Sequence, residues 1–174
     1  LDVRNGGTAT TVSMGNGGVL LADSGAAVSG TRSDGKAFSI GGGQADALML
    51  EKGSSFTLNA GDMATDTTVN GGLFTARGGT LAGTTTLNNG AILTLSGKTV
   101  NNDTLTIREG DALLQGGSLT GNGSVEKSGS GTLTVSNTTL TQKAVNLNEG
   151  TLTLNDSTVT TDVIAQRGTA LKLT

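Results

Sequence analysis

Apolar residues recur along this chain of 174 residues at steps of 18 to 20 positions, and this repeat restricts the possible folds more than any other feature. Three series share the same frame, with glycines between them. The first series is Leu20, Phe38, Phe56, Phe74 and Ile92; the second is Ala9, Ala27, Ala45, Met63 and Leu81; the third is Leu50, Val69, Leu87, Leu105, Val125, Val145 and Val163. A period of this length is typical of solenoids, in which each repeat is buried only by its neighbours.

Within each repeat, a short stretch of alternating apolar and polar residues follows a glycine. Residues 55–58, 132–135 and 151–154 alternate with period two, which predicts strands with one buried face. The corners between them, such as residues 70–72, are rich in Asn and Gly, which accept the positive φ of tight turns. The sequence therefore predicts an all-β, right-handed parallel β-helix. Such a three-sided solenoid would have 18–21 residues per rung and a length of roughly 45 Å.

Stacking of the repeats predicts ladders of inward side chains. Phe38, Phe56 and Phe74 are expected to form a buried aromatic column, with Leu20 and Ile92 at its two ends. Burial of each side chain should contribute about 1.5–3 kcal/mol. The spacing lengthens around residues 98–103 and 121–131, where we expect loops that bulge from the rod.

Composition excludes several functional classes. The chain has no Cys, His, Pro, Trp or Tyr, and its net charge of -3 arises from scattered residues. Without a basic stripe or stacking aromatics, nucleic-acid binding is not expected. Without histidine, the usual activation of a nucleophile is missing, so we predict neither enzymatic activity nor a cofactor or metal. No apolar run is long enough to span a bilayer.

Two local patterns leave weaker alternatives open. Glu109 and Asp111 flank a glycine and could form the carboxylate pair of a glycan-active β-helix, although solvated turn carboxylates are favoured. Residues 41–48 approach a calcium-binding nonapeptide repeat, but Gln44 stands where glycine is expected and the pattern does not recur. An ordinary corner is therefore the favoured interpretation there.

Residues 121–135 resemble the passenger-associated repeat of bacterial autotransporters, in which glycines, a lysine (Lys127) and an alternating strand occur together. Residues 5–12 and 62–72 are similar to a recurring phrase of the antigen 43 family of self-associating adhesins. The resemblance covers essentially the whole chain. It implies that residues 1–174 are a single β-helix segment from the C-terminal part of a longer passenger domain.

The resemblance also implies a location and a function. Such passengers are exported through their own outer-membrane translocator barrel and stay on the bacterial cell surface or are released from it. They associate with identical passengers on neighbouring cells and promote aggregation and biofilm formation. The alternative is a scaffold or folding-core segment, which supports secretion and display without binding directly.

Two polar clusters are the candidates for self-association. Asn101, Asn102 and Asp103 lengthen one corner and are expected to project from the rod, and Arg32, Asp34 and Lys36 form a similar charged cluster. Ordinary solvated corners are the competing interpretation. Because each exposed contact would contribute less than about 1 kcal/mol, adhesion would require many rods acting together.

Overall fold

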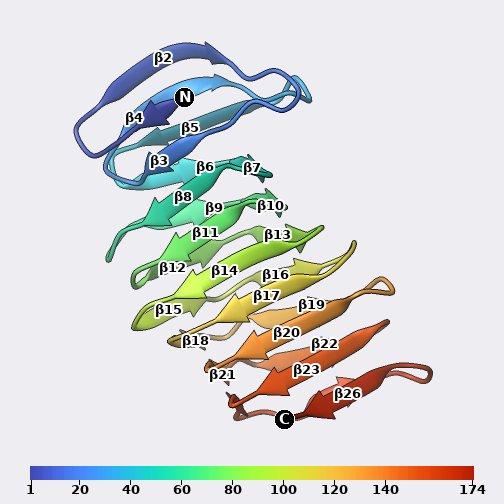
Figure 1. Cartoon of the computed structure of the whole chain (residues 1–174). Coiled ribbons are helices and arrows are strands. Elements are labelled where there is room, and N and C mark those ends of the chain that lie inside the picture. Colours follow the sequence, from blue (N-terminus) through green and yellow to red (C-terminus); the bar gives the residue numbers. More distant parts are fainter.

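The chain winds into a three-sided rod of 26 strands without a helix (Figure 1), in a computed structural model that describes residues 1–174. Each regular turn passes through sheet A, then sheet B, then sheet C, and returns to sheet A one level further along. Neighbouring strands of successive turns pair in parallel, so the predicted three-sided parallel β-helix is confirmed. No helix is present that could cross a membrane.

Sheet A faces the viewer in Figure 1 and runs along the whole rod. Its nine strands, at about 4.8 Å per level, span roughly 40 Å. They are β1 (Asp2–Val3), β3 (Leu21–Asp23), β8 (Ser55–Leu58), β11 (Leu73–Ala76), β14 (Ala91–Leu95), β17 (Ala112–Gln115), β20 (Thr132–Ser136), β23 (Thr151–Asn155) and β26 (Ala170–Leu173).

Sheets B and C complete the triangle. Sheet B contains β2 (Thr8–Ser13), β4 (Ala27–Thr31), β5 (Ala37–Gly41), β6 (Gln44–Asp46), β9 (Met63–Thr65), β12 (Gly79–Ala82), β15 (Lys98–Asn101), β18 (Ser118–Thr120), β21 (Thr139–Thr141) and β24 (Thr158–Val159). Sheet C contains β7 (Met49–Glu51), β10 (Thr68–Asn70), β13 (Thr84–Asn88), β16 (Thr104–Ile107), β19 (Ser124–Lys127), β22 (Ala144–Leu147) and β25 (Val163–Ala165). The three sheets enclose a single core of 34 buried apolar residues.

Phe56 and Phe74 stack in one inward ladder of sheet A. Their ring centroids are 5.7 Å apart and their planes meet at 78°, an edge-to-face contact. The whole ladder is Val3, Ala22, Phe56, Phe74, Leu93, Leu114, Val135, Leu154 and Leu173. The expected terminal members Leu20 and Ile92 are therefore not in this ladder.

Ile92 lies on the outer face because the coil after Phe74 contains one extra residue. Ile92 pairs with Leu73, while Leu93 takes the inward position beside Phe74. A shift of one residue moves a side chain to the opposite face of a strand. Leu20 is buried, but it precedes β3, and its carbonyl accepts a hydrogen bond from the Ser55 amide.

The prediction that Phe38 stacks on Phe56 is wrong. Phe38 lies in β5, which pairs antiparallel with β4 and β6 inside sheet B. These three strands, residues 27–46, form a hairpin insertion that lengthens one turn of the solenoid. Because of this insertion, Ala22 and Phe56 are neighbours in the ladder although they lie 34 residues apart in sequence. This separation is close to two ordinary repeats of 18 residues. The period alone therefore predicted an additional rung between them, with Phe38 in the ladder.

The other two predicted series of apolar residues also do not follow a single ladder of stacked side chains. Leu87 pairs with Val69, whereas Leu105 pairs with Thr85, two positions earlier on the same strand. Met63 is 37% exposed, and its neighbour Ala64 points inward.

The loops predicted around residues 98–103 and 121–131 do not leave the rod as bulges. Residues 98–101 and 124–127 are the regular strands β15 and β19. The extra residues are absorbed by the strands and corners of longer coils, and the largest departure from the repeat is instead the hairpin insertion.

Candidate functional site

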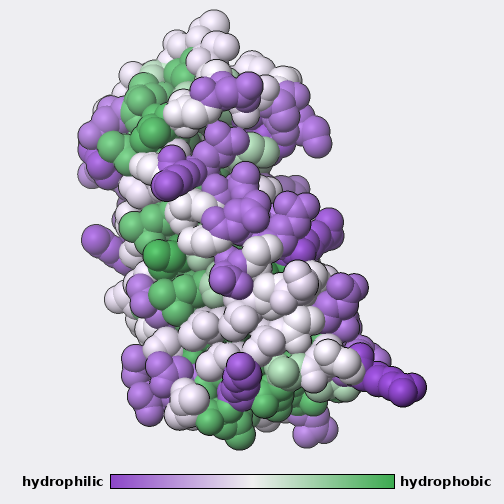
Figure 2. Space-filling model, turned by 45° about the vertical axis from the view of Figure 1, so that its right-hand side comes forward, coloured by the Kyte–Doolittle hydropathy of each residue, from purple (hydrophilic) through white to green (hydrophobic).

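The outer face of sheet A carries two columns of different character. One column contains Leu21, Leu73, Ile92 and Leu113, with Ser55 between the first two. Leu73 is 39% exposed, and the other members are half-buried. We call these five residues the apolar column. Figure 2, in which the face of sheet A is turned to the left, shows apolar clusters along this side of the rod.

A polar column runs beside the apolar one, two residues further along each strand. It contains Thr57, Thr75, Thr94 and Gln115, and the Gln115 side-chain amide donates to the Thr94 hydroxyl at 3.0 Å. No other element of the chain pairs with or covers this face. The sequence analysis did not predict this apolar face, because it assigned Ile92 to the core. The adjacent apolar pairs Leu73–Phe74 and Ile92–Leu93 nevertheless indicate strands that are apolar on both faces.

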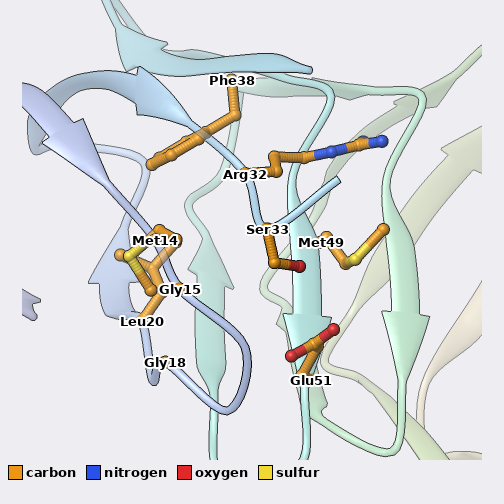
Figure 3. A pocket seen from close by; sticks show the side chains of 9 residues that line it. All are labelled: Met14, Gly15, Gly18, Leu20, Arg32, Ser33, Phe38, Met49 and Glu51. Atoms are coloured by element: carbon orange, nitrogen blue, oxygen red, sulfur yellow. The ribbon is translucent and has the colours of Figure 1, made fainter. Parts of the chain in front are cut away.

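A recess lies where the hairpin insertion meets the first turn of the rod (Figure 3). Met14, Leu20 and Phe38 lie on one side, while Met49 and Glu51 come from β7 on the other. The cavity volume of ≈ 20 Å³ is room for about one water molecule and is far below the roughly 300–1,000 Å³ of small-molecule sites. The recess closes the insertion onto the rod rather than offering a ligand pocket.

The predicted cluster of Arg32, Asp34 and Lys36 forms the tip of the hairpin between β4 and β5. The Arg32 guanidinium pairs with the Asp34 carboxylate and donates to the Ala47 carbonyl oxygen at 3.0 Å. The hydrogen bond from Arg32 lowers the pKa of Asp34 to about 2, assisted by the Lys36 backbone amide. The Arg32 side chain is only 11% exposed, so its charge is paired inside the hairpin. Asp34 and Lys36 both face solvent, but the Asp34 carboxylate is already paired with Arg32, so Lys36 is the exposed member without an ion-pair partner in the cluster.

Asn101 does not project from the rod as predicted. It is fully buried in the lumen, where its side-chain amide donates to the Gln142 Oε1 at 2.8 Å. The Gln142 amide in turn donates to the carbonyl oxygens of Asn101 and Gly121. Gly121 lies between the two levels without a side chain, so Gln142 can reach across it. A buried polar pair therefore occupies what was expected to be an exposed corner.

Asn102 and Asp103 are exposed, but each uses a side-chain oxygen within the rod. The Asn102 Oδ1 accepts from the Asn122 amide at 3.0 Å, and the Asp103 Oδ2 accepts from the Gly83 amide at 2.8 Å. These bonds fasten corners of adjacent levels. They leave the remaining polar atoms of both residues for contact with solvent or a partner.

Lys127 is the only charged side chain in the lumen and lies in a ladder between Ile107 and Leu147. Its ammonium donates to the carbonyl oxygens of Ser128 and Gly129, each at 2.7 Å. Burial lowers the pKa of Lys127, and the Glu149 carboxylate opposes this shift. The lysine therefore ties together the corner backbone and does not present a group for chemistry.

No group of three or more acidic side chains is close enough to hold a metal ion. Glu109 and Asp111, the nearest pair in sequence, are exposed at a corner, and the Asp111 carboxylate accepts from the Thr132 amide at 2.8 Å. Asp111 thus serves as a corner link between two levels.

Residues 29–91 match the model of a known protein family. This segment matches the family described as adhesin of bacterial autotransporter system, probable stalk. The matched residues include the hairpin insertion from β4 onward and the first regular turns of the solenoid, through β13.

Proposed function

We propose, from the premise that this chain is a segment of an autotransporter adhesin passenger, that it is a rigid rod on the bacterial surface that associates side by side with identical rods on neighbouring cells. This contact would promote aggregation and biofilm formation. The passenger would reach the surface through its own translocator barrel.

The observation that carries the proposal is the uncovered outer face of sheet A. Leu73, Ile92 and Leu113 are consecutive in the apolar column and form a contiguous apolar strip. Such a strip on a protein surface marks an interaction site more often than scattered apolar residues do. The polar column beside it repeats at the level spacing of about 4.8 Å, so a second rod with the same spacing can match its hydroxyl and amide groups in register. A second copy of this chain meets that condition.

Weak individual contacts are compatible with cell adhesion. Fully burying an exposed leucine contributes about 1.5–3 kcal/mol. Association of two rods costs roughly 4–15 kcal/mol, because they lose translational and rotational freedom. The apolar column, whose members are already half-buried, therefore gives a weak pair of rods. Many rods on two facing cells act together, so the contact between cells can be stable.

The test measures the settling of cells that display the passenger. Leu73→Lys and Ile92→Lys place charges on the apolar column, and we expect the cells to stay dispersed with normal amounts of passenger on their surface. Thr80→Lys is the matched control, because Thr80 lies in β12 on sheet B, is half-buried like Ile92, and belongs to a neighbouring part of the rod. Undiminished settling of the Leu73 and Ile92 variants would rule out this face. The exposed residues Lys36 and Asn102 would then be the next candidates.

A second candidate function is a scaffold that supports secretion and display. The family description of a stalk favours it, as do the lumen contacts of Lys127, Asn101 and Gln142, which fasten the turns of the second half. Under this hypothesis, deleting residues 121–174 reduces the amount of folded passenger on the surface, whereas the Leu73 and Ile92 variants aggregate normally. Normal display after the deletion would exclude the scaffold.

A further inference from the structure

Asparagine precedes glycine at five corners of the rod. The glycine amide donates a backbone hydrogen bond at four of these corners but not at the fifth. The pairs begin at Asn5, Asn16, Asn70, Asn89 and Asn122. An Asn–Gly pair is chemically labile because the glycine nitrogen can attack the asparagine side-chain carbonyl, and glycine has no side chain to hinder the approach. The attack requires a glycine N–H that is free of other hydrogen bonds and a backbone that can move.

Four of the five glycine amides are occupied. Each donates a backbone hydrogen bond to a carbonyl oxygen on a neighbouring level, 17 to 22 residues away in sequence: Gly6 to Gly25 at 3.0 Å, Gly71 to Asn88 at 2.9 Å, Gly90 to Asp111 at 2.7 Å, and Gly123 to Asn101 at 2.9 Å. These bonds join adjacent levels of the solenoid. Each must break before the nitrogen can react, which requires local opening of the rod.

The Gly17 amide has no hydrogen-bond partner. Asn16 and Gly17 are both exposed, and no atom lies within 4 Å of the position that a side chain on Gly17 would occupy. They form the middle of a turn that is closed by one bond, from the Gly18 amide to the Gly15 carbonyl oxygen at 3.0 Å. This turn lies between β2 and β3, where the first coil has no strand in sheet C, so no ladder restrains it.

We propose that Asn16 is a site of spontaneous deamidation in the folded protein. The Gly17 nitrogen forms a bond to Cγ of Asn16, the bond from Cγ to the side-chain nitrogen breaks, and ammonia leaves with the proton from Gly17. Water then opens the resulting succinimide ring by breaking one of its two C–N bonds, which gives aspartate or isoaspartate. No oxidant or reductant is needed. The product adds a negative charge to the corner whose Gly15 and Gly18 line the recess.

The test follows the five sites in one sample by peptide mapping with mass spectrometry. The purified chain is incubated at mildly alkaline pH, folded in one portion and unfolded in urea in another. Folded protein should convert Asn16 at least about tenfold faster than the other four sites, which corresponds to about 1.4 kcal/mol of opening free energy. In urea, all five sites should convert at similar rates, because their local sequences are alike.

Asn16→Gln is the matched variant, since glutamine would have to form a larger ring and should stop the conversion at this position. Conversion of Asn70 or Asn89 as fast as Asn16 in the folded protein would overturn the proposal. So would an unchanged Asn16 in folded protein under conditions that convert it in urea.

Discussion

The edge-to-face contact of Phe56 and Phe74 gives the register of sheet A a measurable energetic signature. Both side chains are buried, and their centroid distance of 5.7 Å is within the range of favourable aromatic pairs. Leucine is the suitable replacement for either ring, because Leu93 and Leu114 occupy the next positions of the same ladder. Phe56→Leu and Phe74→Leu each remove the aromatic contact while largely preserving the packing.

The double variant should be less destabilised than the sum of the two single variants, by about 0.5–1.5 kcal/mol, because either substitution alone already removes the contact. Guanidinium denaturation followed by circular dichroism measures the three free energies of unfolding. The control is the combination of Phe38→Leu with Phe74→Leu. Because Phe38 lies in the hairpin insertion, these effects should add to within about 0.5 kcal/mol.

A coupling for Phe38 with Phe74 as large as that for Phe56 with Phe74 would restore the three-ring column and refute the register described above. A coupling of zero for Phe56 with Phe74 would show that the rings do not meet. Either outcome would require a different winding of the first turns.

Three further predictions concern buried and titrating groups. Thr85→Val should raise the free energy of unfolding by up to about 1 kcal/mol, because the Thr85 hydroxyl is fully buried without a hydrogen-bond partner; the denaturation midpoint measures this gain. Gln142→Ala should lower the free energy of unfolding by about 1–3 kcal/mol, because the buried Asn101 amide loses the shorter of its two hydrogen bonds; an unchanged midpoint would refute the pairing. The hydrogen bond from Arg32 lowers the pKa of Asp34 from 3.8 to about 2, so its stabilisation of the hairpin is complete above pH 3.8 and is lost as the pH falls through about 2. Asp34→Asn should abolish this acid dependence, which an NMR titration of the tip can follow.

The repeat and the alternation within it were sufficient to predict the solenoid, because strand stacking imposes both. They could not give the register, since corners of slightly different length look alike when each is built from Gly and Asn. One extra residue before Ala91 moved Ile92 to the surface and Leu93 into the core. The hairpin insertion had a recognisable signal in its second turn. Gly42 and Gly43 both have positive φ and connect two short strands, as in two-residue hairpins.

The candidate association residues were harder to predict because polar residues were assumed to face solvent. Asn101 points inward because Gly121 on the next level leaves space for Gln142 to pair with it from two levels away. Such a pairing spans 41 residues and has no local pattern in the sequence. The apolar column was missed for the opposite reason, since every recurring apolar residue was assigned to the core.

Protection of single cysteines tests the central claim most directly, that identical rods meet through the outer face of sheet A. The chain contains no cysteine, so a cysteine introduced at Leu73, Ile92 or Leu113 is the only thiol of the chain that can react with the reagent. On cells that display the passenger, these thiols should react freely with a soluble reagent when the cells are dispersed and slowly when they are aggregated, while Thr80→Cys on sheet B should react equally in both states. Equal reactivity of the three sheet A positions in dispersed and aggregated cells would contradict the proposed contact.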